Sequence, residues 1–181
     1  MIKNRSTQGH SIWLIPAAPQ HQDLQGIIKN LAEKCSTPMF MPHVTLLGQL
    51  SQEADLIKVQ LEALYAVTPV FQLDMSYSSM SDRYFRSVIL NFHPSPQLEL
   101  FYRSAVNALQ ITPEEPFVPH LSLLYSDFEW VKKQHVMEGI ILPTTLSVRI
   151  HEVVLMETEG QPESWKEIAR FQLKPGFSRR H

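Results

Sequence analysis

Two short stretches of the sequence combine residue types that can carry acid–base chemistry. Residues 41–47, MPHVTLL, recur 77 positions later as residues 118–124, VPHLSLL. In a β-strand, residues i and i+2 point to the same side, so each stretch would present an imidazole and a hydroxyl on one face. The apolar residues between them would bury on the other face and fix the aim of the polar pair. The candidate catalytic residues are His43, Thr45, His120 and Ser122.

Two imidazoles and two hydroxyls around one point suit the hydrolysis of a phosphodiester. That reaction needs a base for the attacking water, an acid for the departing oxygen, and hydrogen-bond donors for the non-bridging oxygens. Imidazole has an ordinary pKa of about 6.5, so it can perform either proton transfer at neutral pH. We therefore predict one proton transfer for His43 and the other for His120.

The two stretches do not by themselves form a metal site. Each contains one histidine and no adjacent carboxylate or cysteine. A zinc or two-metal centre would therefore need ligands from elsewhere in the chain. We predict a reaction that uses no metal and no cofactor.

The elements that must position these stretches repeat at the same offset. Apolar runs predict buried strands at residues 11–15 and 88–92, and apolar residues at three- and four-residue steps predict amphipathic helices at 24–31 and 98–109. Downstream, helices are predicted at 52–66 and 129–141, and strands at 70–77, 146–155 and 168–173. The predicted unit is strand, helix, motif strand, helix, strand, present twice.

This repetition predicts an α+β fold that arose by duplication of one unit. Units at about residues 11–80 and 88–157 would form two lobes related by a pseudo-two-fold axis. Each lobe would hold a mostly antiparallel sheet flanked by helices, and the motif strands would face each other across a central cleft. Because no low-complexity linker separates the units, we predict a single domain over residues 1–181.

Composition and charge narrow the class of protein. The chain has 181 residues, of which 44% are hydrophobic, enough for the core of one domain. Its formal net charge of −2 gives no general attraction to long nucleic acids, so a small-molecule substrate is favoured. No stretch predicts a signal peptide or a membrane span, and a single cysteine, Cys35, fits a reducing compartment. We expect a cytoplasmic protein, monomeric by default, with no membrane partner.

Further candidate contacts lie beside the second stretch. Residues 82–87 form either an exposed charged turn or an aromatic and cationic wall beside the phosphate, to which Phe85 and Arg86 would contribute. Tyr125 continues the second stretch at an odd spacing from His120, which would place it on the opposite face. Only a bulge or the end of the strand would turn Tyr125 inward.

The tetrads HVTL at 43–46 and HLSL at 120–123 resemble the signature of the two-histidine phosphoesterase superfamily, a pair of His-apolar-Thr/Ser-apolar motifs. Within that superfamily the chain resembles the cyclic phosphodiesterases of plants and fungi. The likeness extends over nearly the whole chain and is carried by residues 11–13, 40–45, 84–88, 119–125 and 163–165.

The resemblance implies a bilobal fold with a water-filled cleft and a metal-independent hydrolase. The implied substrates are ADP-ribose 1″,2″-cyclic phosphate and nucleoside 2′,3′-cyclic phosphates, which open to 2′-phosphates. His43 and His120 would be the acid–base pair, while Thr45 and Ser122 would hold phosphate oxygens. We take His120 as the base and His43 as the acid, although near symmetry leaves the two roles exchangeable. The implied substrate-binding residues are Trp13, Phe85, Arg86 and Tyr125, with Arg86 replacing an amide side chain and adding a cation for a second phosphate or a pyrophosphate.

Two other functions fit the same motifs. A superfamily enzyme for 2′-5′-linked oligonucleotides or RNA ends would need a longer basic track, whereas Lys and Arg cluster here only at residues 132–133 and 179–180. A nucleotide-binding module without catalysis would keep the pocket, but the presence of both histidines and both hydroxyls argues against it. The pathway, whether tRNA splicing by-products or nucleotide salvage, is left open by the sequence.

Overall fold

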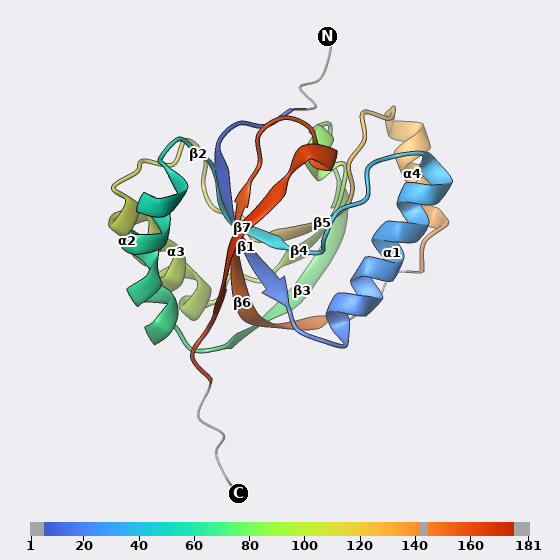
Figure 1. The fold of residues 1–181 in the computed structure, drawn as a ribbon. Coiled ribbons are helices and arrows are strands. Elements are labelled where there is room, and N and C mark those ends of the chain that lie inside the picture. The colour runs from blue at the N-terminus through green and yellow to red at the C-terminus, as the bar shows by residue number, and fades with distance from the viewer. Residues whose placement is uncertain (1–5, 142–144, 176–181) are drawn as a thin grey trace, which may run out of the picture.

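The computed structural model describes residues 6–141 and 145–175, and in them an antiparallel sheet is flanked by helices (Figure 1). The strands are β1 (His10–Pro16), β2 (Val44–Leu50), β3 (Phe71–Met80), β4 (Val88–Phe92), β5 (His120–Leu124), β6 (Ser147–Glu157) and β7 (Lys166–Gln172). The helices are α1 (Gln20–Cys35), α2 (Ala54–Val67), α3 (Pro96–Leu109) and α4 (Trp130–Glu138). The α+β class predicted from the sequence is confirmed. The basic pair at 179–180 lies outside the described residues.

The helices form where the apolar periodicity predicts them. Helix α3 buries Leu98, Phe101, Ala105 and Leu109 along one face, as an amphipathic helix should. Its first turn is capped by Ser95, whose hydroxyl accepts a hydrogen bond from the Leu98 amide at 3.1 Å. Helix α4 ends at Glu138, before the predicted end at residue 141, because Gly139 follows as the C-cap residue and glycine weakens a helix.

The strands of the two predicted units join in one sheet, in the order β1-β2-β5-β4-β3-β6-β7. Strand β6 also pairs with β1, so all strands except β7 close into a ring. The expectation of a separate sheet in each lobe is thereby modified, because strands of one unit pair with strands of the other in β1–β6, β2–β5, β3–β4 and β3–β6, which satisfies their backbone groups.

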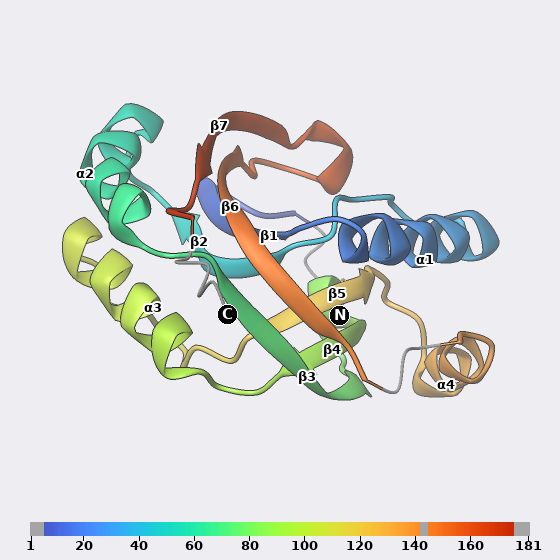
Figure 2. The ribbon, with the colours of Figure 1, turned by 90° about the horizontal axis from the view of Figure 1, so that it is seen from below.

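The pairing pattern has a two-fold symmetry. Exchanging β1, β2 and β3 with β4, β5 and β6 reproduces the same set of strand pairs. The helices obey the same exchange: α2 and α3 lie side by side on one flank of the sheet, and α1 and α4 lie on the opposite flank (Figures 1 and 2). A repeated unit would produce this symmetry, while its boundaries and its origin by duplication stay predictions.

Strand β1 is buried on both faces, and this places one aromatic ring near the first motif. Ile12 and Leu14 enter the main core, whereas Trp13 and Ile15 pack with Val154 on the opposite face. Trp13 is paired in register with Thr45 of β2. None of the helices in the described part of the chain has the length and apolarity needed to cross a membrane.

Candidate active site

The two motifs meet at a single pair of residues, Val44 of β2 and Leu121 of β5. In an antiparallel ladder that contains this pair, His43 stands opposite Ser122 and His120 stands opposite Thr45. Both Val44 and Leu121 are fully buried, so the polar side chains next to them point to the other face. The pseudo-two-fold axis therefore passes between the motifs and brings both histidines and both hydroxyls to one face.

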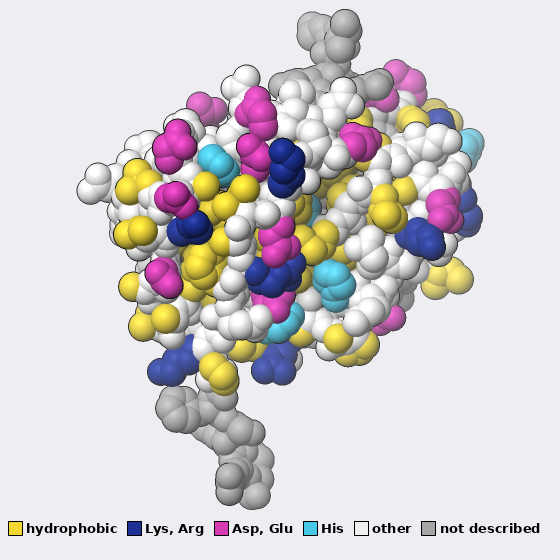
Figure 3. All heavy atoms as spheres, in the orientation of Figure 1, with side chains coloured by type: hydrophobic (Ala, Val, Ile, Leu, Met, Phe, Trp, Pro, Cys, Tyr) yellow, Lys and Arg dark blue, Asp and Glu magenta, His cyan; other side chains and the backbone are white. Residues whose placement is uncertain are grey.

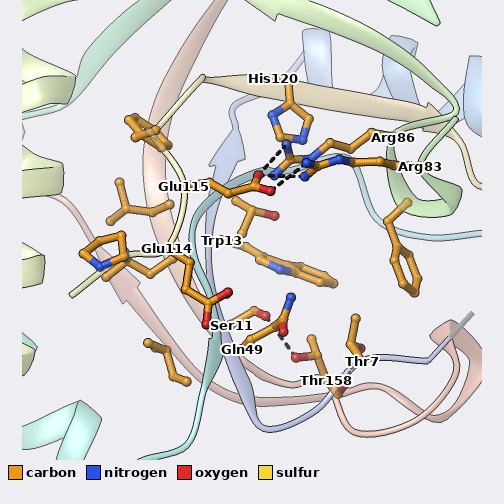
Figure 4. Close-up of a pocket in the computed structure, with 18 of the residues that line it drawn as sticks. Thr7, Ser11, Trp13, Gln49, Arg83, Arg86, Glu114, Glu115, His120 and Thr158 are labelled. Atoms are coloured by element: carbon orange, nitrogen blue, oxygen red, sulfur yellow. Dashed lines mark hydrogen bonds and ion pairs between the residues drawn. The ribbon is translucent and has the colours of Figure 1, made fainter. Parts of the chain in front are cut away.

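That face lines a cavity of about 1120 Å³. All eight residues that the sequence suggested for the site are among its lining residues: Trp13, His43, Thr45, Phe85, Arg86, His120, Ser122 and Tyr125. Figure 4 shows the part of this cavity where Trp13, Arg86 and His120 point toward a common space. The fold thus gathers side chains from β1, β2, β5 and the segment before β4.

Both imidazole rings are held in the same way. Nδ1 of His43 lies 2.6 Å from the carbonyl oxygen of Met41, and Nδ1 of His120 lies 2.8 Å from the carbonyl oxygen of Val118. A carbonyl oxygen can only accept, so each Nδ1 carries the proton and donates it. Each neutral ring therefore has a lone pair on Nε2, which can accept a proton during a reaction.

Burial shifts the titration of both histidines. Loss of hydration lowers the pKa of His43 to about 3, and the adjacent His120 acts in the same direction, against the hydrogen bond to Met41. Burial also lowers the pKa of His120, the Arg86 charge adds to this effect, and the hydrogen bond to Val118 opposes it. Both rings are therefore neutral at pH 7.

The two hydroxyl groups differ in their present partners. Ser122 donates its hydroxyl hydrogen to the carbonyl oxygen of Phe85 at 2.7 Å. Among the described residues, the hydroxyl of Thr45 has no hydrogen-bond partner, and this side chain lines the cavity. A hydroxyl has a single hydrogen to donate, so Ser122 must exchange its bond to Phe85 before it can donate to a ligand.

Aromatic rings surround the first histidine. The indole of Trp13 stacks on His43 with a centroid distance of 3.6 Å and an interplanar angle of 7°. Phe85, half-buried on a short 3₁₀ helix, Tyr84–Arg86, lies edge to face with Tyr125 at 5.3 Å. Tyr125 directly follows Leu124, the last residue of β5, and it lines the cavity. The end of the strand, one of the two conditions that the sequence analysis gave for an inward Tyr125, is therefore met.

Several lining residues were not predicted from the sequence. Trp165 lies within 5.7 Å of both Trp13 and Phe85, while Phe40, in the core behind the lining, stacks on Tyr125 at 3.7 Å. Trp165 belongs to residues 163–165, which contributed to the family resemblance, and this was the available signal for it. Arg83 was missed as well, because its partner lies 32 positions further along the chain.

No group of three or more His, Cys, Asp or Glu side chains in residues 6–141 and 145–175 is arranged to hold a metal ion. The polar side chains that line the cavity carry imidazole, hydroxyl, guanidinium, amide and carboxylate groups.

The sequence is similar to a known protein family and to known enzymes. Residues 8–174 match the family model described as cyclic phosphodiesterase-like protein. A cyclic phosphodiesterase of Arabidopsis thaliana is 24% identical over 173 residues, which cover 92% of this chain and 96% of that protein. A 2′,3′-cyclic-nucleotide 3′-phosphodiesterase of Phaeosphaeria nodorum is 24% identical over 194 residues, with 91% and 99% covered.

Solved structures show the same fold. Escherichia coli LigT complexed with 3′-AMP superposes with a TM-score of 0.58 at 16% identity, covering 92% of this chain and 98% of that chain. The protein TT0787 of Thermus thermophilus gives a TM-score of 0.63 at 14% identity, covering 93% and 99%. These structures have the two-histidine phosphoesterase fold, and the likeness to them is a likeness of fold.

Proposed function

Because the chain belongs to the cyclic phosphodiesterase-like family and is a phosphodiesterase, we propose that it hydrolyses nucleoside 2′,3′-cyclic phosphates to 2′-phosphates. The same site is proposed to open the cyclic phosphate ring of ADP-ribose 1″,2″-cyclic phosphate. The resemblance indicated by the paired motifs is confirmed. The names of the plant and fungal relatives support the substrate class. The observation that carries the proposal is the pairing of His43 and His120 in one cavity, each with its Nδ1 held by a backbone carbonyl.

The proposed reaction is an in-line displacement at phosphorus. One histidine takes a proton from water through Nε2 as the water oxygen bonds to phosphorus, and the bond from phosphorus to the 3′-oxygen breaks. The other histidine, in its protonated state, gives its Nε2 proton to that 3′-oxygen. The product is a 2′-phosphate with a free 3′-hydroxyl, and exchange with solvent restores both rings.

The surroundings of the two histidines favour one division of the two roles. Burial lowers the pKa of His43 to about 3, so the ring is neutral at pH 7 and its Nε2 lone pair is free of a proton. His120 is less buried than His43, and burial is the largest cause that lowers the pKa of each ring. We therefore propose His43 as the base and His120 as the acid, the reverse of the assignment made from the resemblance. The negative charge of a bound substrate phosphate would favour the protonated form that His120 needs as the acid.

The non-bridging phosphate oxygens are proposed to contact Thr45 and Ser122. Thr45 has its hydroxyl available toward the cavity, whereas Ser122 first exchanges its bond to Phe85. The aromatic rings of Trp13, Phe85 and Tyr125 are proposed to hold the nucleoside, since flat rings offer surface for a base. No metal or cofactor enters the scheme.

A small substrate suits the surface better than a long nucleic acid. On the face shown in Figure 3, Lys and Arg side chains are interspersed with Asp and Glu, and none of the described residues there form a continuous basic band. An electrostatic track for a strand needs such a band. The proposed enzyme acts on small cyclic phosphates, as a monomer in the cytoplasm.

The experiment that tests the proposal is product analysis by ³¹P NMR with adenosine 2′,3′-cyclic phosphate. We expect adenosine 2′-phosphate from the wild type and none from a variant with both His43→Ala and His120→Ala. A 3′-phosphate product would contradict the proposed bond cleavage. Faster turnover of a 2′-5′-linked dinucleotide would favour the RNA-processing alternative, and tight binding of the cyclic nucleotide without turnover would favour a non-catalytic binding module.

A further inference from the structure

A charged cluster outside the histidine pair lines the same cavity. Arg83 donates two hydrogen bonds to the carboxylate of Glu115: Nη1 lies 2.7 Å from Oε2, and Nη2 lies 2.6 Å from Oε1. Nη1 of Arg86 lies 3.8 Å from Oε2 of the same carboxylate. One carboxylate thus sits between two guanidinium groups, and Figure 4 shows the cluster beside His120.

Two guanidinium groups around one oxyanion form an arrangement that also fits phosphate. The planar fork of an arginine matches two oxygens of a phosphate as well as two oxygens of a carboxylate. A phosphate monoester brings more negative charge than a carboxylate. Glu115 therefore occupies a place that a phosphoryl group of a ligand can take.

The carboxylate of Glu115 can leave this place at little cost. It lies on residues 112–116, an exposed segment before β5, and its side chain is 52% exposed, while that of Arg83 is 58% exposed. Ion pairs exposed to this extent contribute little to stability, because water and salt screen them. A more highly charged anion can therefore compete for the arginines.

The two arginines, in contrast, are tied to the catalytic face through their backbone. The hydroxyl of Ser81 accepts from the Arg83 amide at 3.2 Å and donates to the Arg86 carbonyl at 2.7 Å. Phe85, between the arginines, accepts the hydrogen bond from Ser122. The backbone from which the two arginine side chains extend is therefore held beside β5.

We propose that Arg83 and Arg86 form a subsite for a second phosphoryl group of the substrate, which Glu115 occupies until such a group displaces it. The inference rests on the proposed function. The preferred substrates are cyclic phosphates that also carry a phosphate monoester or a pyrophosphate elsewhere in the molecule. Glu115 competes with that second group for the two arginines and so reduces the preference without abolishing it.

The test compares the KM of adenosine 2′,3′-cyclic phosphate with that of the same nucleotide carrying a 5′-phosphate. The wild type should have the lower KM for the 5′-phosphorylated substrate. Arg83→Gln should shift the ratio of the two KM values toward one by about tenfold, the factor for one charged hydrogen-bonded contact. Glu115→Gln should increase the preference, because the competing anion is gone.

Glu114→Gln is the matched control. Glu114 lies on the same exposed segment, and among the described residues it forms no ion pair with either arginine. This variant should keep the wild-type ratio. An equal KM ratio in the wild type, Arg83→Gln and Glu115→Gln overturns the subsite, whereas turnover of either substrate leaves the proposed function standing.

A binding measurement distinguishes failure of the proposed function from failure of the arginine subsite. If neither substrate is hydrolysed, the proposed function fails, and titration calorimetry with inorganic pyrophosphate tests the subsite alone. Binding that is lost in Arg83→Gln and tightened in Glu115→Gln supports the subsite. Absence of binding in the wild type, equal binding in all variants, or weaker binding in Glu115→Gln overturns it, the last because the ion pair would then be structural.

Discussion

The indole of Trp13 lies flat on the imidazole of His43, with 3.6 Å between ring centroids. The same imidazole is held at Nδ1 by the carbonyl oxygen of Met41, at 2.6 Å. The ring is therefore fixed at one face and at one nitrogen, and its Nε2 is left for chemistry. Strand β1, about thirty residues before the motif, thus orients the ring of His43 through Trp13.

Removal of the stacked ring should misplace His43. We expect Trp13→Ala to lower kcat by about 10²-fold, because a displacement of about 1 Å of a catalytic group can reduce the rate by that factor. Trp13→Phe keeps a flat ring and should lie between the alanine variant and the wild type. Steady-state kinetics with adenosine 2′,3′-cyclic phosphate measure this, and equal kcat in all three proteins would show that the stack has no catalytic effect.

A substrate whose leaving group needs no proton should distinguish the acid histidine from the base histidine. Each of His43→Ala and His120→Ala should lower kcat/KM for a cyclic nucleotide by about 10² to 10⁴, the usual worth of positioned acid–base catalysis. With a p-nitrophenyl phosphodiester the departing oxygen needs no proton, so the acid variant, His120→Ala, should retain more of the wild-type rate. If His43→Ala retains more, then His43 is the acid.

The burial of His43 should make the folded state sensitive to acid. Its pKa of about 3 in the folded protein lies below the value of about 6.5 for an exposed histidine, so between these pH values only the unfolded chain binds the proton. The free energy of unfolding therefore falls as the pH falls through this window.

We expect His43→Gln to lose less stability than the wild type between about pH 7 and pH 4.5, by about 2 kcal/mol. Urea unfolding at the two pH values measures this difference. His93→Gln, at an exposed histidine between β4 and α3, is the control and should follow the wild type. A His43→Gln variant with the wild-type dependence on pH would contradict the assigned burial effect.

Removal of the Thr45 hydroxyl and removal of the Ser122 hydroxyl should have different effects on the stability of the fold. Thr45→Val keeps the shape of the side chain but removes the hydroxyl, so we expect kcat/KM to fall by about 10² with no loss of stability. Ser122→Ala should also cost about 1 kcal/mol of folding free energy, because the buried bond to Phe85 is lost. Thr45→Ser retains the hydroxyl and should stay near the wild type. Kinetics and thermal unfolding of the three variants test both statements.

Activity should withstand removal of divalent ions. The proposed scheme assigns each proton transfer to a histidine, so dialysis against EDTA should leave kcat/KM of the wild type unchanged. The measurement is the rate with adenosine 2′,3′-cyclic phosphate before and after dialysis. Loss of activity that Mg²⁺, Mn²⁺ or Zn²⁺ restores would replace this scheme by a metal-assisted one.

Much of the fold followed from local patterns. Periods of two and of three to four residues predicted the strands and helices because the burial of one face dictates those spacings. The end of α4 at Glu138 was misplaced because apolar residues continue after Gly139. The joining of both halves into one sheet was not predicted, since pairing between β2 and β5 depends on edges that meet only in the folded chain.

The same division applies to the site. His43 and His120 were found from sequence because the repeat marks them, and repetition is a one-dimensional signal. Tyr125 could not be placed, because its direction depends on where β5 stops. Arg83 and Glu115 were not paired, since an exposed ion pair between distant segments leaves no periodic trace.

The sequence by itself determined which residue types recur, at what spacing, and hence the family and the class of reaction. Only the tertiary structure decided that Trp13 stacks on His43, that burial shifts the two imidazoles unequally, and that Glu115 lies between two arginines. The physical reason is that spacing along a chain governs local conformation, whereas burial and electrostatic environment depend on segments that the fold brings together from far apart.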